Sequence, residues 1–158
     1  MMIQEQVDAD HDRARRRAFF GGLRARLLGG RDHLLSFDEV RRALGAHNRF
    51  YLGRKVVEVS KIVGSVGRHR EFDRNFMPLT ANLGYRWKRV DQALRRGVEL
   101  PAVSLNKIGA AYFVEDGNHR VSVARYQGVE MIDAEVTQFE AHSSMGLKVS
   151  DLELAVAC

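Results

Sequence analysis

A strand pattern that runs through a short polar turn into a helix pattern constrains this chain more than any other feature. Residues 112–115 read as a strand, residues 116–120 as the turn, and residues from Asn118 to Gln127 as a helix. A helix start presents unpaired backbone N–H groups and the positive end of the helix dipole, which together suit an anion. Sheets flanked by helices place ligands at such strand-to-helix junctions, so the sequence predicts an anion site here.

The side chains of the turn strengthen this prediction. Gly117 lets the backbone approach a ligand closely, Asn118 and His119 can donate hydrogen bonds, and Arg120 offers a planar fork suited to phosphate. Asp116 is the candidate for holding a Mg²⁺ that accompanies a nucleotide. A purely structural alternative stays open, in which Asn118 is a helix N-cap and Asp116 closes an Asx turn.

A glycine-rich stretch upstream is the second candidate for phosphate contact. From Lys55 the pattern alternates as in a strand, and a loop then runs through Gly64, Ser65 and Arg68. The backbone of such a loop can face a phosphate while the arginine neutralises it. His69, next along the chain, is the nearest additional candidate for proton transfer.

The turn, with the helix that follows it, resembles the ParB N-terminal/sulfiredoxin-like superfamily, whose members bind nucleotides at this position. The similar string is Asp-Gly-Asn-His-Arg at 116–120, and the likeness extends over about residues 55–137. ParB-type proteins carry Gly-Glu-Arg-Arg there, sulfiredoxins Gly-Cys-His-Arg, and a related free-serine kinase Asp-Gly-His-His-Arg. The resemblance implies a small mixed β-sheet flanked by helices, binding of CTP or ATP with Mg²⁺, and Asp116 and His119 as catalytic candidates.

Departures from these relatives limit the chemistry that can be expected. Asn118 stands where sulfiredoxins carry their thiolate nucleophile, so the sequence argues against sulfiredoxin activity. The same position holds a glutamate in ParB-type proteins, so we expect CTP hydrolysis to be slow or absent. The enzyme question stays open between a weak NTPase or phosphotransferase and a binding module without catalysis.

Positive charge favours polyanions as additional partners. The chain has 25 Lys and Arg against 20 Asp and Glu, and many of the arginines gather in two segments. The DNA-binding candidates are Arg15, Arg16 and Arg17 in the first segment and Arg86 and Arg89 in the second. The alternative is that these arginines cover the solvated faces of two helices.

The remaining pattern predicts an α+β domain with an N-terminal helical extension. Helices are expected over residues 11–28, over a short segment opened by the Ser36–Glu39 capping box, and over 81–96; a linker follows Gly45. Strands are expected at 55–60, 100–105, 112–115 and 131–137. We divide the chain into a basic extension (1–50), a ParB/sulfiredoxin-like domain (51–140) and a tail (141–158), and we assign Trp87 to the core.

Composition indicates a cytoplasmic protein without a membrane partner. No apolar run approaches the roughly 20 residues that span a bilayer. A single cysteine, Cys158, is compatible with a reducing compartment and excludes a disulfide within the chain. The apolar pattern of the tail would suit a homodimer interface, with residues 143–146 as a loop before it.

Three functions therefore compete. The first is a regulatory nucleotide-binding module, associated with DNA, that holds CTP or ATP at residues 116–120. The second is a small-molecule kinase or NTPase of the same type. The third is a DNA-binding protein that uses its basic helices and has a purely structural turn.

Overall fold

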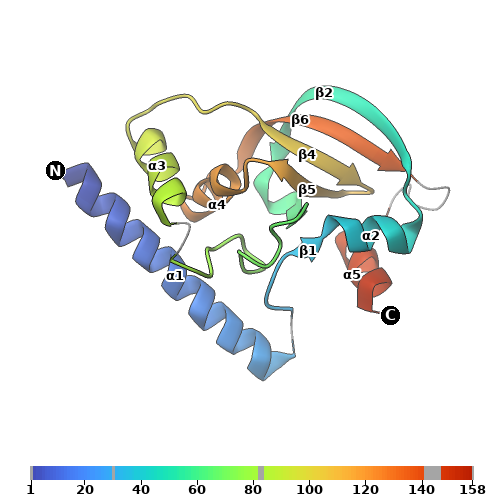
Figure 1. Ribbon diagram of the computed structural model, residues 1–158, viewed down its shortest axis with the longest axis horizontal. Helices are drawn as coiled ribbons and strands as arrows, with labels where there is room; N and C mark the ends of the chain where they lie inside the picture. Colours follow the sequence, from blue (N-terminus) through green and yellow to red (C-terminus); the bar gives the residue numbers. More distant parts are fainter. Residues whose placement is uncertain (1, 30, 82–83, 141–146, 158) are drawn as a thin grey trace.

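The computed structural model describes residues 2–29, 31–81, 84–140 and 147–157 and contains a six-stranded mixed sheet flanked by helices. The strands are β1 (Leu35–Ser36), β2 (Asn48–Glu58), β3 (Ile62–Ser65), β4 (Val103–Ile108), β5 (Ala111–Asp116) and β6 (Met131–Glu140). The helices are α1 (Met2–Leu28), α2 (Phe37–Leu44), α3 (Gly84–Arg95), α4 (Asn118–Tyr126) and α5 (Val149–Ala157), with a 3₁₀ turn at Val59–Lys61. The predicted α+β class, with an N-terminal helix, is confirmed (Figure 1).

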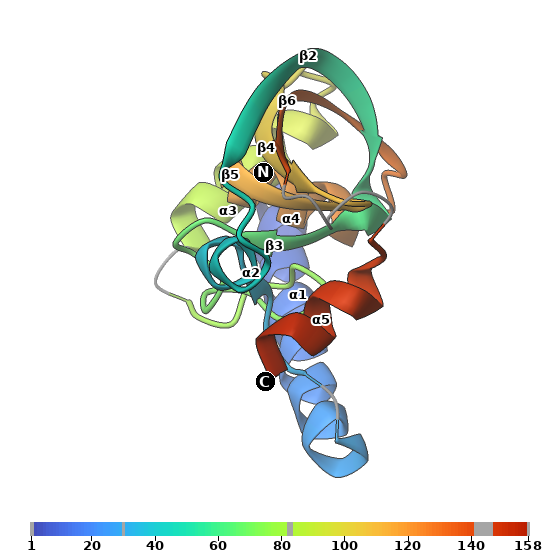
Figure 2. The same cartoon turned by 90° about the vertical axis from the view of Figure 1, so that its right-hand side faces the viewer.

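The strands follow the order β1-β3-β5-β4-β6-β2. Neighbours pair in parallel at β1–β3, β3–β5 and β4–β6, and in antiparallel fashion at β4–β5 and β2–β6. Strands β2 and β6 bend strongly across the sheet (Figure 2). The parallel β3–β5 pair brings Ser65 opposite Val114, close to the carboxyl end of β5 where the polar turn begins.

Both faces of the sheet are covered. Neighbouring residues on a strand point to opposite faces, and Phe113 and Val114 of β5 are each fully buried, in different apolar clusters. The cluster around Val114 includes Val121 of α4, whereas the cluster around Phe113 includes Val40 of α2 and Leu152 of α5. Helix α4 is therefore anchored directly on the sheet.

Trp87 belongs to the core, as predicted. It is fully buried with Ala14 and Ala18 of α1 and Val123 of α4, so one apolar cluster joins three helices. Its indole Nε1 donates to Ser122 Oγ at 2.8 Å, and Ser122 Oγ donates in turn to the backbone carbonyl of Phe76. This chain of bonds satisfies the buried polar atoms and sets α3 against α4.

The capping box predicted at Ser36 is confirmed. Ser36 is the N-cap of α2 and its Oγ accepts the backbone N–H of Glu39 at 3.4 Å, while Gly45 ends the helix in a left-handed conformation at φ 61°. The strand that precedes this helix, β1, pairs with β3 and so belongs to the same sheet as the rest. The division of the chain at residues 50 and 140 stays a prediction.

Several predicted boundaries were wrong. Helix α1 begins at Met2 rather than residue 11, and the segment expected as a linker after Gly45 contains the start of β2 at Asn48. Strand β4 begins at Val103, beyond Pro101, because its register is set by pairing with β6. The expected loop at 143–146 and Cys158 lie outside the described residues. None of the helices in the described part of the chain combines the length and apolar character that crossing a membrane requires.

A buried charged cluster holds α1 against α3. Asp10 and Asp91 are 1% and 0% exposed, and Arg95 approaches the carboxylates of both, Asp10 at 2.5 Å and Asp91 at 3.6 Å. Tyr126 donates to Asp10 at 3.2 Å and Gln127 donates to Asp91 at 2.5 Å. Burial, together with the nearby Asp10 carboxylate, raises the pKa of Asp91 to about 7, so this carboxyl keeps its proton in mildly acidic solution.

We predict that Asp91→Asn changes the pH dependence of stability. The unfolded carboxyl ionises near pH 4 while the folded one stays protonated to about pH 7, so its contribution to stability falls as pH rises through that interval, by up to about 1.4 kcal/mol per pH unit. Asparagine mimics the protonated form and does not titrate. Urea unfolding at pH 5 and pH 8 should therefore show the variant gaining stability relative to wild type at the higher pH; a constant difference would contradict this.

Candidate functional site

The polar turn lies on the wall of an open cleft of about 620 Å³. The cleft is bounded by the end of β5 with the start of α4, by the loop that follows β3, and by α3. Charged side chains reach it from all three elements: Arg68, Arg86, Arg89, Glu115, Asp116 and Arg120. Two predicted sets of residues thus meet at one place, because Arg86 and Arg89, expected to bind DNA, lie with the turn and with Arg68.

Gly117 makes the abrupt change from strand to helix. It is the N-cap of α4 with φ 109°, a left-handed conformation that a residue with a side chain rarely adopts. A Cβ at this position would lie 2.6 Å from Val103 Cγ1. The turn has no side-chain cap, so the N–H groups of Asn118, His119 and Arg120 have no acceptor within the helix and are available to an anion.

Asn118 is the first residue of α4 rather than its N-cap, which corrects the structural alternative for this position. Its side chain is buried, and its Oδ1 accepts a hydrogen bond from Ser65 Oγ at 2.7 Å. That bond orients the amide so that the Nδ2 donor is the end left for a ligand. Ser65 therefore positions Asn118, and Ser65 itself does not line the cleft among its described residues.

Gly64 is a packing residue. A Cβ there would lie 2.4 Å from the carbonyl oxygen of Leu35 and 2.4 Å from Phe113 Cδ1, so only glycine allows β1, β3 and β5 to approach this closely. Gly64 is not among the described residues that line the cleft, and its contact with a phosphate stays a prediction.

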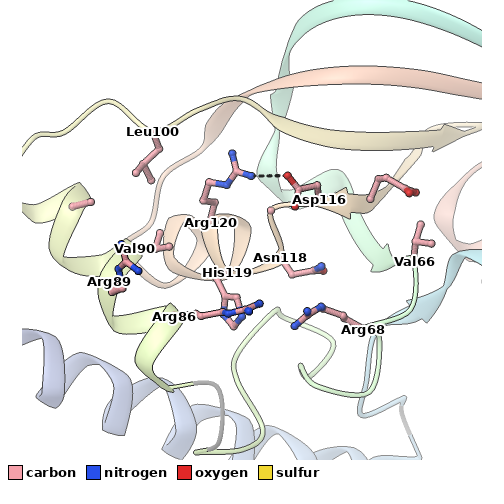
Figure 3. A pocket seen from close by; sticks show the side chains of 13 residues that line it. Val66, Arg68, Arg86, Arg89, Val90, Leu100, Asp116, Asn118, His119 and Arg120 are labelled. Atoms are coloured by element: carbon pink, nitrogen blue, oxygen red, sulfur yellow. Dashed lines mark hydrogen bonds and ion pairs between the residues drawn. The ribbon is translucent and has the colours of Figure 1, made fainter.

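Arg120 is engaged by its own surroundings. Its guanidinium donates to the carbonyl oxygens of Pro101 at 2.7 Å and Ala102 at 3.1 Å, and it pairs with Asp116 at 3.1 Å. Figure 3 shows this side chain directed away from the space between Arg68 and Arg86. Arg120 therefore fastens the turn to the segment before β4, and Asp116, although 78% exposed, meets an arginine rather than closing the Asx turn considered above.

Arg68 and Arg86 are the cations that face the helix start. They extend toward each other from the loop after β3 and from α3, with Asn118 and His119 beside them (Figure 3). Arg86 makes no ion pair with any residue that the structure describes, and Arg68 makes one partly exposed pair with Glu71 at 3.3 Å. A partly exposed pair contributes little stability, so a phosphate can replace Glu71 at low cost.

His119 is the most unusual group in the cleft. Within the described part of the chain neither of its ring nitrogens has a hydrogen-bond partner, although both atoms are buried. Burial first, and then the positive charges of Arg68 and Arg86, lower its pKa to about 4. The imidazole is therefore neutral at physiological pH, which makes it a poor general base and leaves an unpaired N–H donor in an electropositive cleft.

The side chains at the cleft give little support for a metal site. No cluster of three or more metal-ligating side chains of His, Cys, Asp or Glu exists within the ranges that the structure describes. Asp116 is the single carboxylate at the turn that could accompany a nucleotide-bound Mg²⁺, and it would have to leave Arg120 to do so. His69, the additional candidate for proton transfer, lies outside the lining of this cleft.

Sequence reasoning missed the part that α3 plays in this cleft. In the sequence, the arginines of α3 lie far from the polar turn and were assigned a different role. The packing of Trp87 against α4 brings them to the cleft. No local signal in residues 84–95 indicates this approach, because it depends on contacts between distant segments.

Comparisons with known proteins do not assign the chain to a family. No family model matches the chain, and no curated protein matches it. Among solved structures, the chain is similar to the crystal structure of sulfiredoxin from Arabidopsis thaliana, with a TM-score of 0.38 and 17% sequence identity over 52% of this chain and 82% of that chain. Membership of the ParB/sulfiredoxin-like superfamily stays a prediction.

We predict that Gly117→Ala destabilises the protein more than Gly128→Ala does. Both glycines have positive φ, 109° and 76°, but a Cβ at Gly117 meets Val103 whereas one at Gly128 meets nothing within 4 Å. Backbone strain alone costs about 1 kcal/mol, and the clash at Gly117 should add at least about 1 kcal/mol. Equal losses of unfolding free energy in urea would contradict the close approach described here.

Proposed function

We propose that this protein is a nucleotide-binding module that holds the phosphates of CTP or ATP, with Mg²⁺, at the start of α4. The observation that carries the proposal is the convergence of Arg68 and Arg86 on an uncapped helix start beside the unpaired His119 nitrogens. Oriented N–H groups and guanidinium forks are the donors that phosphates accept best. The cleft volume of about 620 Å³ also exceeds what an inorganic phosphate alone would fill.

Each donor has a distinct part in the proposed complex. The N–H groups of residues 118–120 and the Asn118 amide form the cradle, and Arg68 and Arg86 neutralise charge from either side. The neutral imidazole of His119 donates one hydrogen bond, and a bound phosphate would raise its pKa by offsetting the arginine charges. Gly64 and the guanidinium of Arg120 support this arrangement, the first by close strand packing and the second through the carbonyl oxygens that it binds.

Binding without fast catalysis is the form of this function that the site favours. The two carboxylates at the cleft already have partners, Glu115 with Asn106 at 3.0 Å and Asp116 with Arg120. Before a ligand binds, the depressed pKa of His119 makes it a poor base near neutral pH, and in the proposed complex its ring donates a hydrogen bond to the phosphate. We therefore propose a regulatory role, in which the nucleotide changes the affinity for a partner such as DNA or a second copy of the chain.

Calorimetric titration with CTP, ATP, GTP and ADP in the presence of Mg²⁺ tests the proposal. One nucleotide should bind in the micromolar range, and Arg86→Ala should weaken its binding by roughly tenfold or more, the loss of one charge-assisted hydrogen bond. Arg86 is exposed and makes no ion pair with a described residue, so the variant should fold normally.

Arg96→Ala is the matched control, because Arg96 is exposed just beyond the end of α3 and does not line the cleft. It should bind as wild type does. If none of the four nucleotides binds while the protein is folded, the proposal is contradicted. Formation of a phosphorylated product or of inorganic phosphate, followed by ³¹P NMR, would instead favour the kinase or NTPase alternative.

A further inference from the structure

A second cleft, of about 740 Å³, lies between α1, the loop at 72–77 and α4. Its lining is strongly basic. Its lining includes five arginines and one carboxylate: Arg13, Arg16, Arg17, Arg24, Arg125 and Asp73. The C-terminal half of α1, which supplies one wall, projects away from the sheet in both Figure 1 and Figure 2.

The one carboxylate does not neutralise the rim. Asp73 is buried, and its Oδ1 accepts the backbone N–H groups of Asn75 and Met77 at 2.8 Å each, so it serves the fold of its own loop. Its second oxygen lies 3.4 Å from where a Cβ of Gly21 would stand, which places the loop closely against α1. Asp73 also offsets the charge of half-buried Arg125, on the floor of the cleft.

The arginines on α1 are largely free to bind a ligand. Arg16 and Arg24 are exposed and form no ion pair with a residue in the described ranges. Arg13 pairs weakly with Asp10 at 3.5 Å, and Arg17 lies over the ring of Tyr126 at 4.8 Å. Like charges held this close on one helix raise the potential of the cleft and attract a polyanion.

An aromatic ring stands among these charges. Phe20 lines the same cleft and is 62% exposed, one turn after Arg16 and one turn before Arg24. The Phe19 ring meets it edge-on with the ring centroids 5.5 Å apart, and the rest of the Phe20 ring is open to solvent. A planar group stacked on Phe20 would have guanidinium groups on both sides along the helix axis.

We propose that this second cleft binds a single-stranded nucleic acid, with backbone phosphates on Arg16, Arg24 and Arg125 and a base stacked on Phe20. Unpaired strands offer both a chain of phosphates and free base faces, which is the combination that arginines interleaved with an aromatic ring recognise. A duplex hides its base faces, and a lipid surface does not enter a hollow. The proposal does not depend on the nucleotide cleft.

The structure also separates the arginines that the sequence grouped for DNA binding. Arg15 and Phe19 line a different hollow on the other side of α1, with Arg26 and Arg70, whereas Arg16 and Phe20 line the cleft described here. Arg15 and Arg16 are the same residue type at adjacent positions, and so are Phe19 and Phe20. Arg15 is therefore a matched control for Arg16. Because Phe19 packs edge-on against Phe20, the control for Phe20 is Phe19→Leu, which removes the aromatic ring and keeps an apolar contact.

Fluorescence anisotropy with labelled (dT)20 at several salt concentrations tests the proposal on the full chain. Arg16→Ala should weaken binding at least fivefold and reduce the slope of log affinity against log salt by about 0.7. Phe20→Ala should weaken it at least fivefold with an unchanged slope, because stacking releases no counterions. Arg15→Ala and Phe19→Leu should stay within twofold of wild type.

Several outcomes would overturn the proposal. These are equal effects of the two members of either pair, tighter binding of a 20-bp duplex than of the strand, or no binding of (dT)20 while vesicles rich in phosphatidylserine are bound. All four substituted residues are exposed, and circular dichroism verifies that each variant folds. Titration of Phe20→Ala with mononucleotide should match wild type, so failure at one cleft is distinguishable from failure at the other.

Discussion

The left-handed turn at Gly117 is the constraint on which the rest of this structure depends. It converts β5 into α4 without an intervening loop, and it does so against Val103 of the neighbouring strand, where no side chain fits. Because α4 is packed on the sheet through Val121, its first turn is held rigidly at the edge of the cleft. The hydrogen bond from Ser65 to Asn118 then links this helix start to β3, two elements that are distant in the sequence.

The same helix positions both clefts. On its first turn α4 carries Asn118 and His119 toward Arg68 and Arg86, and further along it carries Arg125 toward the arginines of α1. Trp87 and Ser122 hold α3 against α4, and the Asp10, Asp91 and Arg95 cluster holds α1 against α3. Positive charge is therefore concentrated on a firmly packed helical layer, where few carboxylates are free to offset it. Preorganised cations of this kind bind phosphates without first having to be ordered.

The helices and strands could be predicted from the sequence better than the roles of individual residues. The strand-turn-helix at 111–126, the Ser36 cap and the burial of Trp87 follow from local rules of periodicity and capping, and each is found in the structure. Gly64 and Arg120 were assigned to phosphate because glycine and arginine suit that purpose, yet one packs three strands together and the other binds two backbone carbonyls. Those roles depend on residues more than 15 positions away, which no local pattern reveals.

The most direct measurement is an NMR titration of the ¹⁵N-labelled protein with ATP and CTP, following backbone amides and histidine rings together. The account predicts that the amides of Asn118, His119 and Arg120 shift most, and that the pKa of His119 rises from about 4 as the ligand binds. Saturating nucleotide that leaves these three amides and the His119 ring unchanged, or that shifts only residues of α1, would contradict a phosphate site at the start of α4.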